Sequence, residues 1–494
     1  MALKICLVLS RPTLEDDLNL YLTYQNYVDL VEVRADKLHE SERARLGEWP
    51  LLKKIPSILT LRVVEDGGDF RGSIDDRIRF FEERLDEGWD WWDLEENLEL
   101  PKNLVSEYRK KQGKVLRSFH DFSGIPSDAL ERAQRMASQA DAVKVAVMVQ
   151  NSAQLLELFF LAQDLRKIPH VVLGMGEYGV PSRILGAALG SLWTYASGEQ
   201  TNNLGQLNPK TLRQVYHIEG WEADQPVFGV VGNPISHSKS PLIHNHGFEQ
   251  VGFTGIYVPF LADHLEDILV LDEVLNLRGL SITLPHKEKA VELSYFADEA
   301  SRSAKAANTL LNTPKGWIAH NTDVVGFIKP LLRFWKVEQL HDKRITVIGS
   351  GGAARGVIWA LLNVGAKVLI LGRTPSKVES LAREFGLEWA ILQPDSIEKI
   401  TQFNHAIIQT SSAGMGEQIG VDPFEFYPWN GTELAYDIIY NPRQTQFLKR
   451  AQQAGCPTLS GWEMFVEQAR EQFELFTGEE LPLDGRALEQ LDWV

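Results

Sequence analysis

A lysine in an apolar segment is the residue of this chain best suited to covalent chemistry. Lys144 lies in D-A-V-K-V-A-V-M at 141–148, with β-branched and small apolar residues on both sides. Burial disfavours the ammonium and lowers the pKa of a lysine, so we expect a neutral amine that can attack a ketone. A lysine at a sheet edge, or one reaching solvent past the end of a barrel strand, is the alternative. The groups that lie beside Lys144 in the fold decide between the two.

Groups that would complete such a site follow other strand-like segments of the first half. Glu32 and Arg34 have the period-two spacing that places both side chains on one face of a strand. Arg62 ends the next strand, and His120 ends the strand that contains S-F-H-D. In a barrel the carboxyl ends of the strands meet at one mouth, where an amine, a base and an anion-binding group come together. His120 alone fits a hydrogen-bonded structural histidine equally well.

A second group of polar residues lies in the other half, in the segments 281–290, 306–310 and 320–326. We expect each segment to be a strand end turning into a loop, the usual place for ligand groups in α/β folds. Reduction of a ketone needs a proton donor at the developing alkoxide, and a lysine paired with an aspartate can supply and orient one. Lys287 and Asp323 are the candidates, although each alone also fits an ordinary surface ion pair.

A hydroxyl-rich turn opens this half at 229–243, G-V-V-G-N-P-I-S-H-S-K-S-P-L-I. An apolar strand closed by Asn233 and Pro234 delivers several short hydroxyl side chains, among them Ser238 and Ser240, to one small volume. Such a loop suits a polyhydroxylated ligand. A serine-rich solvated turn is the alternative.

A nucleotide-binding pattern begins near residue 349. Gly349, Gly351 and Ala354 match G-x-G-x-x-G/A between the strand I-T-V-I and a helix expected to begin near Ala353. The glycines permit a tight turn and close approach of a pyrophosphate to the helix N-terminus, although such turns also use glycine for steric reasons alone. The strand K-V-L-I-L-G at 367–372 strengthens the dinucleotide interpretation.

The end of that strand indicates which dinucleotide binds. An NAD site usually has an acidic residue there for the ribose hydroxyls, whereas this chain has Gly372 followed by Arg373 and Thr374, with Lys377 a turn later. Cationic groups there favour a 2′-phosphate and therefore NADP, although they also fit surface charges. The expected cofactor residues of this region are Gly349, Gly351, Gly352, Ala353, Ala354, Arg373, Thr374 and Lys377.

Short apolar runs alternate with helical spacing over the first two hundred residues. Helical spacing is clearest at 75–87 and 151–166, and a last helix is expected within 208–226. The pattern predicts a (β/α)8 TIM barrel, with a doubly wound sheet as the alternative. The eight expected strands are 4–9, 28–35, 57–62, 89–95, 114–121, 141–148, 169–176 and 190–196.

The chain of 494 residues is longer than one hydrophobic core normally organises. We expect a barrel over 1–222, a substrate-binding α/β domain over 226–335 plus 458–494, and a Rossmann-like domain over 336–457. The helix-like stretch at 461–476 would pack back on the second of these.

The composition restricts the partners. The formal net charge of -17 disfavours nucleic acid and anionic membrane surfaces, which reward excess lysine and arginine. Cys6 and Cys456 lack the spacing of a disulfide framework or a zinc site, so we expect no metal. The N-terminal apolar run is too short for a signal peptide, and no segment reaches the length of a membrane span. A cytoplasmic protein with small-molecule partners is therefore expected.

The first half resembles type I 3-dehydroquinate dehydratase from end to end. The matching pieces are V-E-V-R-A-D, T-L-R-V-V-E-D-G-G, S-F-H-D-F, V-K-V-A-V-M, G-V-P-S-R-I-L-G and L-G-Q. The resemblance implies that Lys144 forms an imine with the substrate ketone and that His120 is the general acid and base. The residues it implies for binding hydroxyls and carboxylate are Glu32, Arg34, Arg62, Arg183 and Gln206.

Two positions depart from that family. Asp66 stands where the family typically has a glutamate before Gly-Gly to orient the histidine, so its carboxylate is one methylene shorter. Asn202 stands where the family usually has a serine four residues before the loop glutamine. An asparagine can still hydrogen-bond a carboxylate, so we expect altered affinity rather than inactivity.

The second half resembles shikimate dehydrogenase through N-P-I-S-H-S-K-S-P-L, I-T-L-P-H-K, A-N-T-L, N-T-D-V-V-G, G-S-G-G-A-A and G-W-E-M-F-V-E-Q. The resemblance implies that Ser238 and Ser240 bind the substrate carboxylate, that Lys287 and Asp323 form the catalytic pair, and that Gly461 approaches the nicotinamide. The family often has asparagine where Ser281 and Gly372 stand here. The other residues that would line the pocket are Thr283, Asn308, Tyr440 and Gln468.

Together the resemblances imply a bifunctional enzyme that dehydrates 3-dehydroquinate to 3-dehydroshikimate and reduces that product to shikimate with NADPH. One alternative is a dehydrogenase whose barrel is catalytically weak and serves as a scaffold or binding module, as Asp66 and Asn202 would allow. Another is a quinate-preferring dehydrogenase that uses NAD.

Overall fold

The computed structural model describes residues 2–52, 54–198, 204–236 and 238–483. The chain divides into two compact units, Met1–Leu277 and Arg278–Val494, and each is described by itself.

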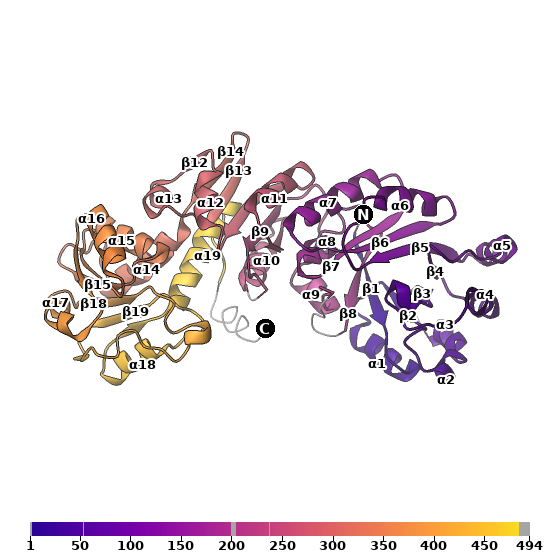
Figure 1. Ribbon diagram of the computed structural model, residues 1–494, viewed down its shortest axis with the longest axis horizontal. Helices are drawn as coiled ribbons and strands as arrows, with labels where there is room; N and C mark the ends of the chain where they lie inside the picture. Colours follow the sequence, from indigo (N-terminus) through magenta and orange to yellow (C-terminus); the bar gives the residue numbers. More distant parts are fainter. Residues whose placement is uncertain (1, 53, 199–203, 237, 484–494) are drawn as a thin grey trace. The chain divides into compact units, whose positions relative to one another are not determined.

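A sheet of eight parallel strands forms most of the first unit, in the order β7-β6-β5-β4-β3-β2-β1-β8. β8 pairs with β1, and an isolated bridge between His170 and Ser191 connects β7 to the segment before β8. The sheet is therefore a nearly closed barrel, which confirms the predicted fold (Figure 1). The strands are β1 (Lys4–Leu9), β2 (Leu30–Arg34), β3 (Ser57–Thr60), β4 (Trp91–Glu95), β5 (Lys114–Asp121), β6 (Ala142–Met148), β7 (His170–Met175) and β8 (Trp193–Ser197).

Helices follow the strands along the chain, as the alternating pattern predicts (Figure 1). α4 shows how the sequence sets a boundary, because Ser73 and Asp76 form a capping box at its start. The last helix expected within 208–226 is α9, and a connection without a further helix follows it to Pro226. The helices of the barrel are α1 (Leu14–Tyr24), α2 (Glu40–Arg43), α3 (Trp49–Leu52), α4 (Ile74–Glu83), α5 (Lys102–Lys110), α6 (Ala129–Ala137), α7 (Ser152–Asp164), α8 (Val180–Ile184) and α9 (Pro209–Gln214).

The rest of the first unit is a parallel pair of strands with two helices. β9 (Val227–Gly232) pairs with β10 (Ile256–Leu261). α10 (Ser240–Val251) connects them, and α11 (Leu265–Val270) follows β10.

The second unit begins with antiparallel strands. β13 (Thr309–Thr313) pairs with both β11 (Leu277–Ile282) and β14 (Gly316–His320) in antiparallel fashion. Asn308 therefore precedes a strand, and the expectation that 306–310 is a strand end was wrong. The physical reason is the β13–β14 hairpin, which reverses the chain in a region that we had expected to follow parallel-strand geometry. The remaining elements here are β12 (Phe296–Ala297), α12 (Lys287–Glu292), α13 (Glu299–Ala304), α14 (Thr322–Trp335) and α19 (Gly461–Thr477).

A parallel sheet in the order β17-β16-β15-β18-β19-β20 completes the second unit. Its apolar residues form two buried clusters, and α14 contributes Phe327 and Leu331 to one of them. This arrangement confirms the predicted Rossmann-like fold. The elements are β15 (Arg344–Ile348), α15 (Gly352–Asn363), β16 (Lys367–Gly372), α16 (Pro375–Phe385), β17 (Glu388–Ile391), α17 (Ile397–Thr401), β18 (Ala406–Gln409), β19 (Leu434–Asp437), α18 (Gln446–Gln453) and β20 (Thr458–Leu459).

Candidate functional site

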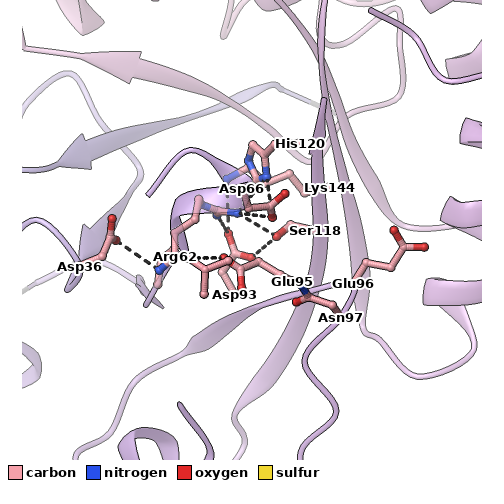
Figure 2. A network of polar contacts seen from close by, with 12 residues as sticks. Asp36, Arg62, Asp66, Asp93, Glu95, Glu96, Asn97, Ser118, His120 and Lys144 are labelled. Carbon is pink, nitrogen blue, oxygen red and sulfur yellow. Dashed lines mark hydrogen bonds and ion pairs between the residues drawn. The ribbon is translucent and has the colours of Figure 1, made fainter. Parts of the chain in front are cut away.

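Lys144 lies in the middle of β6 with its side chain inside the barrel, and only 4% of the residue is exposed. Its Nζ is 3.4 Å from Asp93 Oδ2 (Figure 2). The same nitrogen is 3.3 Å from Glu32 Oε1 and 4.1 Å from the centre of the Tyr195 ring. The two carboxylates compensate the charge of a buried ammonium. The sequence argument counted burial alone, whereas the structure adds these opposing charges.

Arg62 connects this lysine to the histidine. Arg62 is only 2% exposed. Its guanidinium donates a hydrogen bond of 2.7 Å to Asp93 Oδ2 and another of 2.9 Å to His120 Nδ1 (Figure 2). Burial disfavours the charge, but the carboxylates of Asp93 and Glu32 outweigh burial and raise the pKa of Arg62. Arg62 therefore remains a cation that fixes the position of the imidazole.

His120 lies near the end of β5 with 10% of its side chain exposed. Burial first, and then the charges of Arg62 and Lys144, hold its pKa well below the usual value. A guanidinium only donates hydrogen bonds, so Nδ1 accepts from Arg62 and the ring proton resides on Nε2. Asp66 Oδ2 is farther from Nδ1, at 3.4 Å. The neutral imidazole is thus held mainly by the arginine.

These side chains surround a cavity of about 110 Å³ at the barrel mouth. Asn202 lies outside the described residues. All the other residues predicted for the barrel site line this cavity: Glu32, Arg34, Arg62, Asp66, His120, Lys144, Arg183 and Gln206.

Arg183 is the group in this cavity best arranged to hold an anion. It is 1% exposed, and its Nη2 donates 2.9 Å to the Leu204 carbonyl. Its Nε and Nη1 have no partner among the described residues, and burial lowers its pKa to about 10. Arg34, by contrast, already makes two bonds of 2.9 and 2.8 Å to Asp36. An anionic ligand would satisfy the buried donors of Arg183.

The second unit contains a separate polar cluster around Lys287 and Asp323. Lys287 Nζ donates a hydrogen bond of 2.6 Å to Asp323 Oδ2. Asn308 Nδ2 donates one of 2.9 Å to the other oxygen of that carboxylate. Gln468 Oε1 lies 3.4 Å from the same amide nitrogen. Four of the predicted residues therefore meet at one place.

Three elements position this cluster. Lys287 is the first residue of α12. Its carbonyl accepts a hydrogen bond of 2.8 Å from the backbone N of Ala307, the residue before Asn308. Asp323 is the second residue of α14, which packs on α19, and Gly326 lies at their crossing. A Cβ at Gly326 would lie 2.7 Å from Gln468 Cβ, so glycine permits the close approach that brings Gln468 to the cluster.

Two further predicted pocket residues lie in the second unit. Tyr440 stacks on Phe465 with ring centres 4.9 Å apart and is 42% exposed. Partial burial raises its pKa, and the charge of Lys287 opposes that effect. Thr283 follows β11, and its carbonyl accepts 2.9 Å from His286 N. Its partial burial leaves the side chain accessible.

Ser238 and Ser240 belong to the first unit. Ser240 is the first residue of α10, and its backbone N donates 3.3 Å to Ser238 Oγ. Ser238 N donates a hydrogen bond of 3.0 Å to the Ile235 carbonyl, and this bond closes a turn after β9. The hydroxyl groups of both serines therefore lie at the start of a helix.

The turn between β15 and α15 has the geometry that a dinucleotide requires. Gly349 has φ +132°, and a Cβ there would lie 2.3 Å from Thr410 Oγ1. Gly351 caps α15, and a Cβ at Gly351 or Gly352 would meet no atom within 4 Å, so the backbone amides are open to a ligand. Ala354 is fully buried against the sheet, whereas its neighbour Ala353 is exposed.

The end of β16 carries the expected cations. Arg373, Thr374 and Lys377 are exposed, and neither cation forms an ion pair with another described residue. A Cβ at Gly372 would lie 2.4 Å from Val378 Cγ2, so an asparagine at this position would require Val378 to move.

Gly461 is constrained by its own surroundings. A Cβ on this residue, the first of α19, would lie 2.2 Å from the Ile438 carbonyl oxygen. The glycine therefore lets the helix begin directly against the segment after β19.

The chain matches family models of both predicted enzymes. The model described as type I 3-dehydroquinase matches 5–222, the shikimate dehydrogenase substrate-binding domain 230–310, shikimate/quinate 5-dehydrogenase 334–418, and the shikimate 5′-dehydrogenase C-terminal domain 461–485. The chloroplastic bifunctional 3-dehydroquinate dehydratase/shikimate dehydrogenase of Arabidopsis thaliana is 32% identical over 473 residues, covering 91% of this chain and 78% of that protein. This chain belongs to the bifunctional 3-dehydroquinate dehydratase/shikimate dehydrogenase family.

The dehydrogenase half has further relatives. A shikimate dehydrogenase (NADP(+)) of Caldanaerobacter subterraneus is 36% identical over 260 residues, covering 51% of this chain and 92% of that protein. The crystal structure of shikimate dehydrogenase from Aquifex aeolicus is 29% identical, covers 55% of this chain and 98% of that chain, and has a TM-score of 0.49.

No described helix combines the length and the apolar character needed to cross a bilayer. The described residues also contain no group of three or more His, Cys, Asp or Glu side chains placed to hold a metal ion.

Sequence reasoning missed several residues of the dehydratase cluster. Asp93 is fully buried and bonds Arg62, Lys144 and Ser118, whose Oγ donates 2.5 Å to Asp93 Oδ1. Tyr195 lies against the lysine from β8. The available signal was an acidic residue on the inward face of W-D-W-W-D-L-E at 89–95, because a buried barrel strand rarely carries an unpaired acid.

Gln472 is the corresponding omission in the dehydrogenase cluster. Its Nε2 donates hydrogen bonds of 3.0 Å to the Asn308 carbonyl and 2.8 Å to Thr309 Oγ1. Its Oε1 accepts a hydrogen bond of 2.9 Å from Ser281 Oγ. Gln472 follows Gln468 by one helical turn, a spacing that places both on one face of α19. Ser281, which stands where the shikimate dehydrogenase family often has asparagine, is thus a hydrogen-bond partner of Gln472.

Lengthening Asp66 is expected to change the dehydratase. Asp66→Glu extends the carboxylate toward His120 Nδ1, now 3.4 Å away, and favours the tautomer whose Nε2 accepts a proton. We expect dehydratase kcat to rise by about 2- to 10-fold, the scale of a modest gain in general-base efficiency. The measurement is kcat for 3-dehydroquinate, with Asp66→Asn as the matched control that should lower it. A lower kcat in the glutamate variant would contradict this role of Asp66.

Proposed function

We propose that the barrel cluster dehydrates 3-dehydroquinate through an imine on Lys144, and that the cluster around Lys287 reduces 3-dehydroshikimate with NADPH. Membership of the bifunctional family supports the pair of activities. The observation that carries the residue assignment is the buried amine of Lys144, which shares a cavity with His120 and the unsatisfied donors of Arg183. Consecutive reactions account for both sites being in one chain.

In the dehydratase step Lys144 Nζ attacks the ketone carbon, and the carbonyl oxygen leaves as water. Attack requires the neutral amine, and Glu32 Oε1 at 3.3 Å is placed to accept the proton. The iminium then draws electrons from the neighbouring carbon. His120 removes a proton from that carbon through Nε2 once the ring proton has moved to Nδ1, which faces Asp66. The same imidazole returns that proton to the departing hydroxyl, which leaves as a second water. Hydrolysis of the imine consumes one water and restores the lysine.

Arg183 is assigned the carboxylate of the dehydratase substrate, because its Nε and Nη1 are buried donors without described partners. Glu32, Arg34, Arg62, Asn202 and Gln206 remain proposed substrate ligands. Arg62 also orients His120, since it donates to Nδ1.

In the dehydrogenase step Lys287 and Asp323 act as one unit. Lys287 Nζ donates the proton that the developing alkoxide requires, and Asp323 holds that amine at 2.6 Å. NADPH, when bound, supplies the hydride. Ser238 and Ser240 are proposed to bind the carboxylate. The proposed ligands of the ring hydroxyls are Thr283, Asn308, Gln468 and Tyr440.

The nucleotide site fits NADP. The open amides at Gly351 and Gly352 suit a pyrophosphate, and the exposed Arg373 and Lys377 suit a 2′-phosphate. Thr374, Gly349, Ala353 and Ala354 form the rest of the proposed site, with Gly461 beside the nicotinamide. The proposed domains are 1–222, 226–335 plus 458–494, and 336–457.

Removing both cations is expected to reduce the preference for NADPH. A charge-assisted bond to phosphate contributes about 1.5–3 kcal/mol, so Arg373→Ala with Lys377→Ala should raise the KM for NADP by at least about tenfold and leave that for NAD nearly unchanged. KM values for both cofactors are the measurement. Arg383→Ala removes another exposed arginine of α16 and serves as the control. An equal loss for both cofactors would contradict recognition of the 2′-phosphate.

The rival in which the barrel is a weak or non-catalytic module is favoured by one observation, the 3.4 Å separation of Asp66 and His120. Borohydride reduction in the presence of 3-dehydroquinate separates the two. We expect substrate-dependent mass on the peptide that contains Lys144, and an unmodified peptide would support the scaffold instead. The Arabidopsis relative is chloroplastic by name, and a cytoplasmic location for this chain stays a prediction.

A further inference from the structure

A buried serine of the barrel bonds a segment of the dehydrogenase half within the first unit. Ser152 begins α7 and is 1% exposed. Its Oγ donates 2.6 Å to Asp267 Oδ2 and accepts at 3.3 Å from the backbone N of both Asp263 and His264. A side chain of the dehydratase barrel therefore holds the segment between β10 and α11.

Ser152 bridges the backbone before α11 and a side chain in the first turn of that helix. His264 is the N-cap residue of α11, yet its own side chain makes no capping bond. Ser152 Oγ accepts from the backbone N of His264 and donates to the carboxylate of Asp267, the third residue of the helix. The barrel serine thus connects the residue before α11 to the first turn of that helix.

Two further hydrogen bonds connect Asp263 of the same segment to the barrel and to the dehydrogenase half. Tyr178 OH donates 2.6 Å to Asp263 Oδ1, and Asn233 Nδ2 donates 3.3 Å to the same oxygen. Tyr178 lies in the turn that leads into α8, the helix of Arg183. Burial, followed by the bond to Asp263, raises the pKa of the tyrosine to about 12, so its hydroxyl remains a donor at neutral pH.

Asn233 connects the Asp263 contact to the proposed substrate-binding turn. It directly follows β9 and opens the turn that carries Ser238 and Ser240. One carboxylate oxygen therefore receives a hydrogen bond from the barrel and another from the start of the proposed carboxylate-binding turn. Ser152 fixes the backbone of that same aspartate.

We propose that Tyr178 and Ser152 of the barrel are positioning residues for the dehydrogenase, because they fix Asp263, which in turn fixes Asn233 and the turn after it. The inference rests on the proposed role of Ser238 and Ser240 in binding the substrate carboxylate. Neither Tyr178 nor Ser152 touches the reacting atoms. Their effect falls on substrate affinity, which ground state and transition state share, and therefore on KM rather than kcat.

The test uses the full chain with Tyr178→Phe, which removes one hydroxyl. We expect the KM for shikimate to rise about 3- to 10-fold with kcat within about twofold, the scale of one lost hydrogen bond that acts on the substrate through other residues. Ser152→Ala should act in the same direction. Tyr24→Phe is the matched control, because Tyr24 OH bonds Gly198 O and Asn208 Nδ2 elsewhere on the barrel. Dehydratase kcat should remain within about twofold in all three variants.

A double-mutant cycle adds a readout that general destabilisation would not produce. If Tyr178 and Asn233 act through Asp263, the combined Tyr178→Phe and Asn233→Ala variant should raise KM by clearly less than the product of the two single effects. An unchanged KM in Tyr178→Phe, independent effects in the cycle, or parallel loss of dehydratase activity would each overturn the inference. A wild-type chain that does not oxidise shikimate would instead refute the proposed function.

Discussion

Lys144→Met is expected to reduce dehydration of 3-dehydroquinate by about 10⁴-fold or more, because the variant has no amine to form the imine. Oxidation of shikimate by the same protein should stay within about twofold, since Lys287 and Asp323 lie in the other compact unit. The measurement is the initial rate of each activity, assayed separately. Dehydrogenase activity in the variant also shows that the chain has folded.

Lys144→Arg is the matched control for this prediction. It keeps a positive charge between Glu32 and Asp93 but cannot form an imine, so the dehydratase loss should be equally large. The methionine variant leaves buried carboxylates without one cation, which costs about 3–5 kcal/mol of unfolding free energy. Its melting temperature should therefore be lower than that of the arginine variant. Dehydratase activity near the wild-type level in either variant would refute the imine.

Lys287→Met is expected to lower dehydrogenase kcat by about 10²- to 10⁴-fold, the usual contribution of a positioned proton donor. Asp323→Asn should have a smaller effect in the same direction, because it leaves Lys287 in place but removes the charge that orients it. Steady-state kcat and KM for shikimate are the measurement, and the dehydratase rate should be unchanged.

Lys289→Met is the control for the catalytic pair. Lys289 lies on the same helix and pairs with Glu292 at 3.2 Å, so its loss should leave kcat within about twofold. A Lys287 variant with raised KM and normal kcat would show that this lysine binds substrate without moving a proton.

Most strands were predictable because buried parallel strands are apolar runs bounded by polar turns. The expected strands at 4–9 and 114–121 coincide with β1 and β5. The error at 306–310 arose where the chain departs from that pattern. Asn308 precedes β13 because the strands there are antiparallel.

The site was predictable where family motifs carry the residues, and less so where burial and charge decide. Asp93 went unnoticed because its role depends on contacts with Arg62 and Lys144, which come from other strands. The choice of Arg62 over Asp66 as the partner of His120 Nδ1 likewise depends on distances of 2.9 and 3.4 Å. Spacing along one strand cannot give either result.

Both activities are tested together by giving the purified full chain 3-dehydroquinate and NADPH and measuring the NADPH oxidised and the shikimate formed. We expect one NADPH to be oxidised for each shikimate, with no reaction when 3-dehydroquinate is omitted. Unreacted 3-dehydroquinate, or accumulation of 3-dehydroshikimate while NADPH remains unoxidised, would contradict a chain that performs both steps.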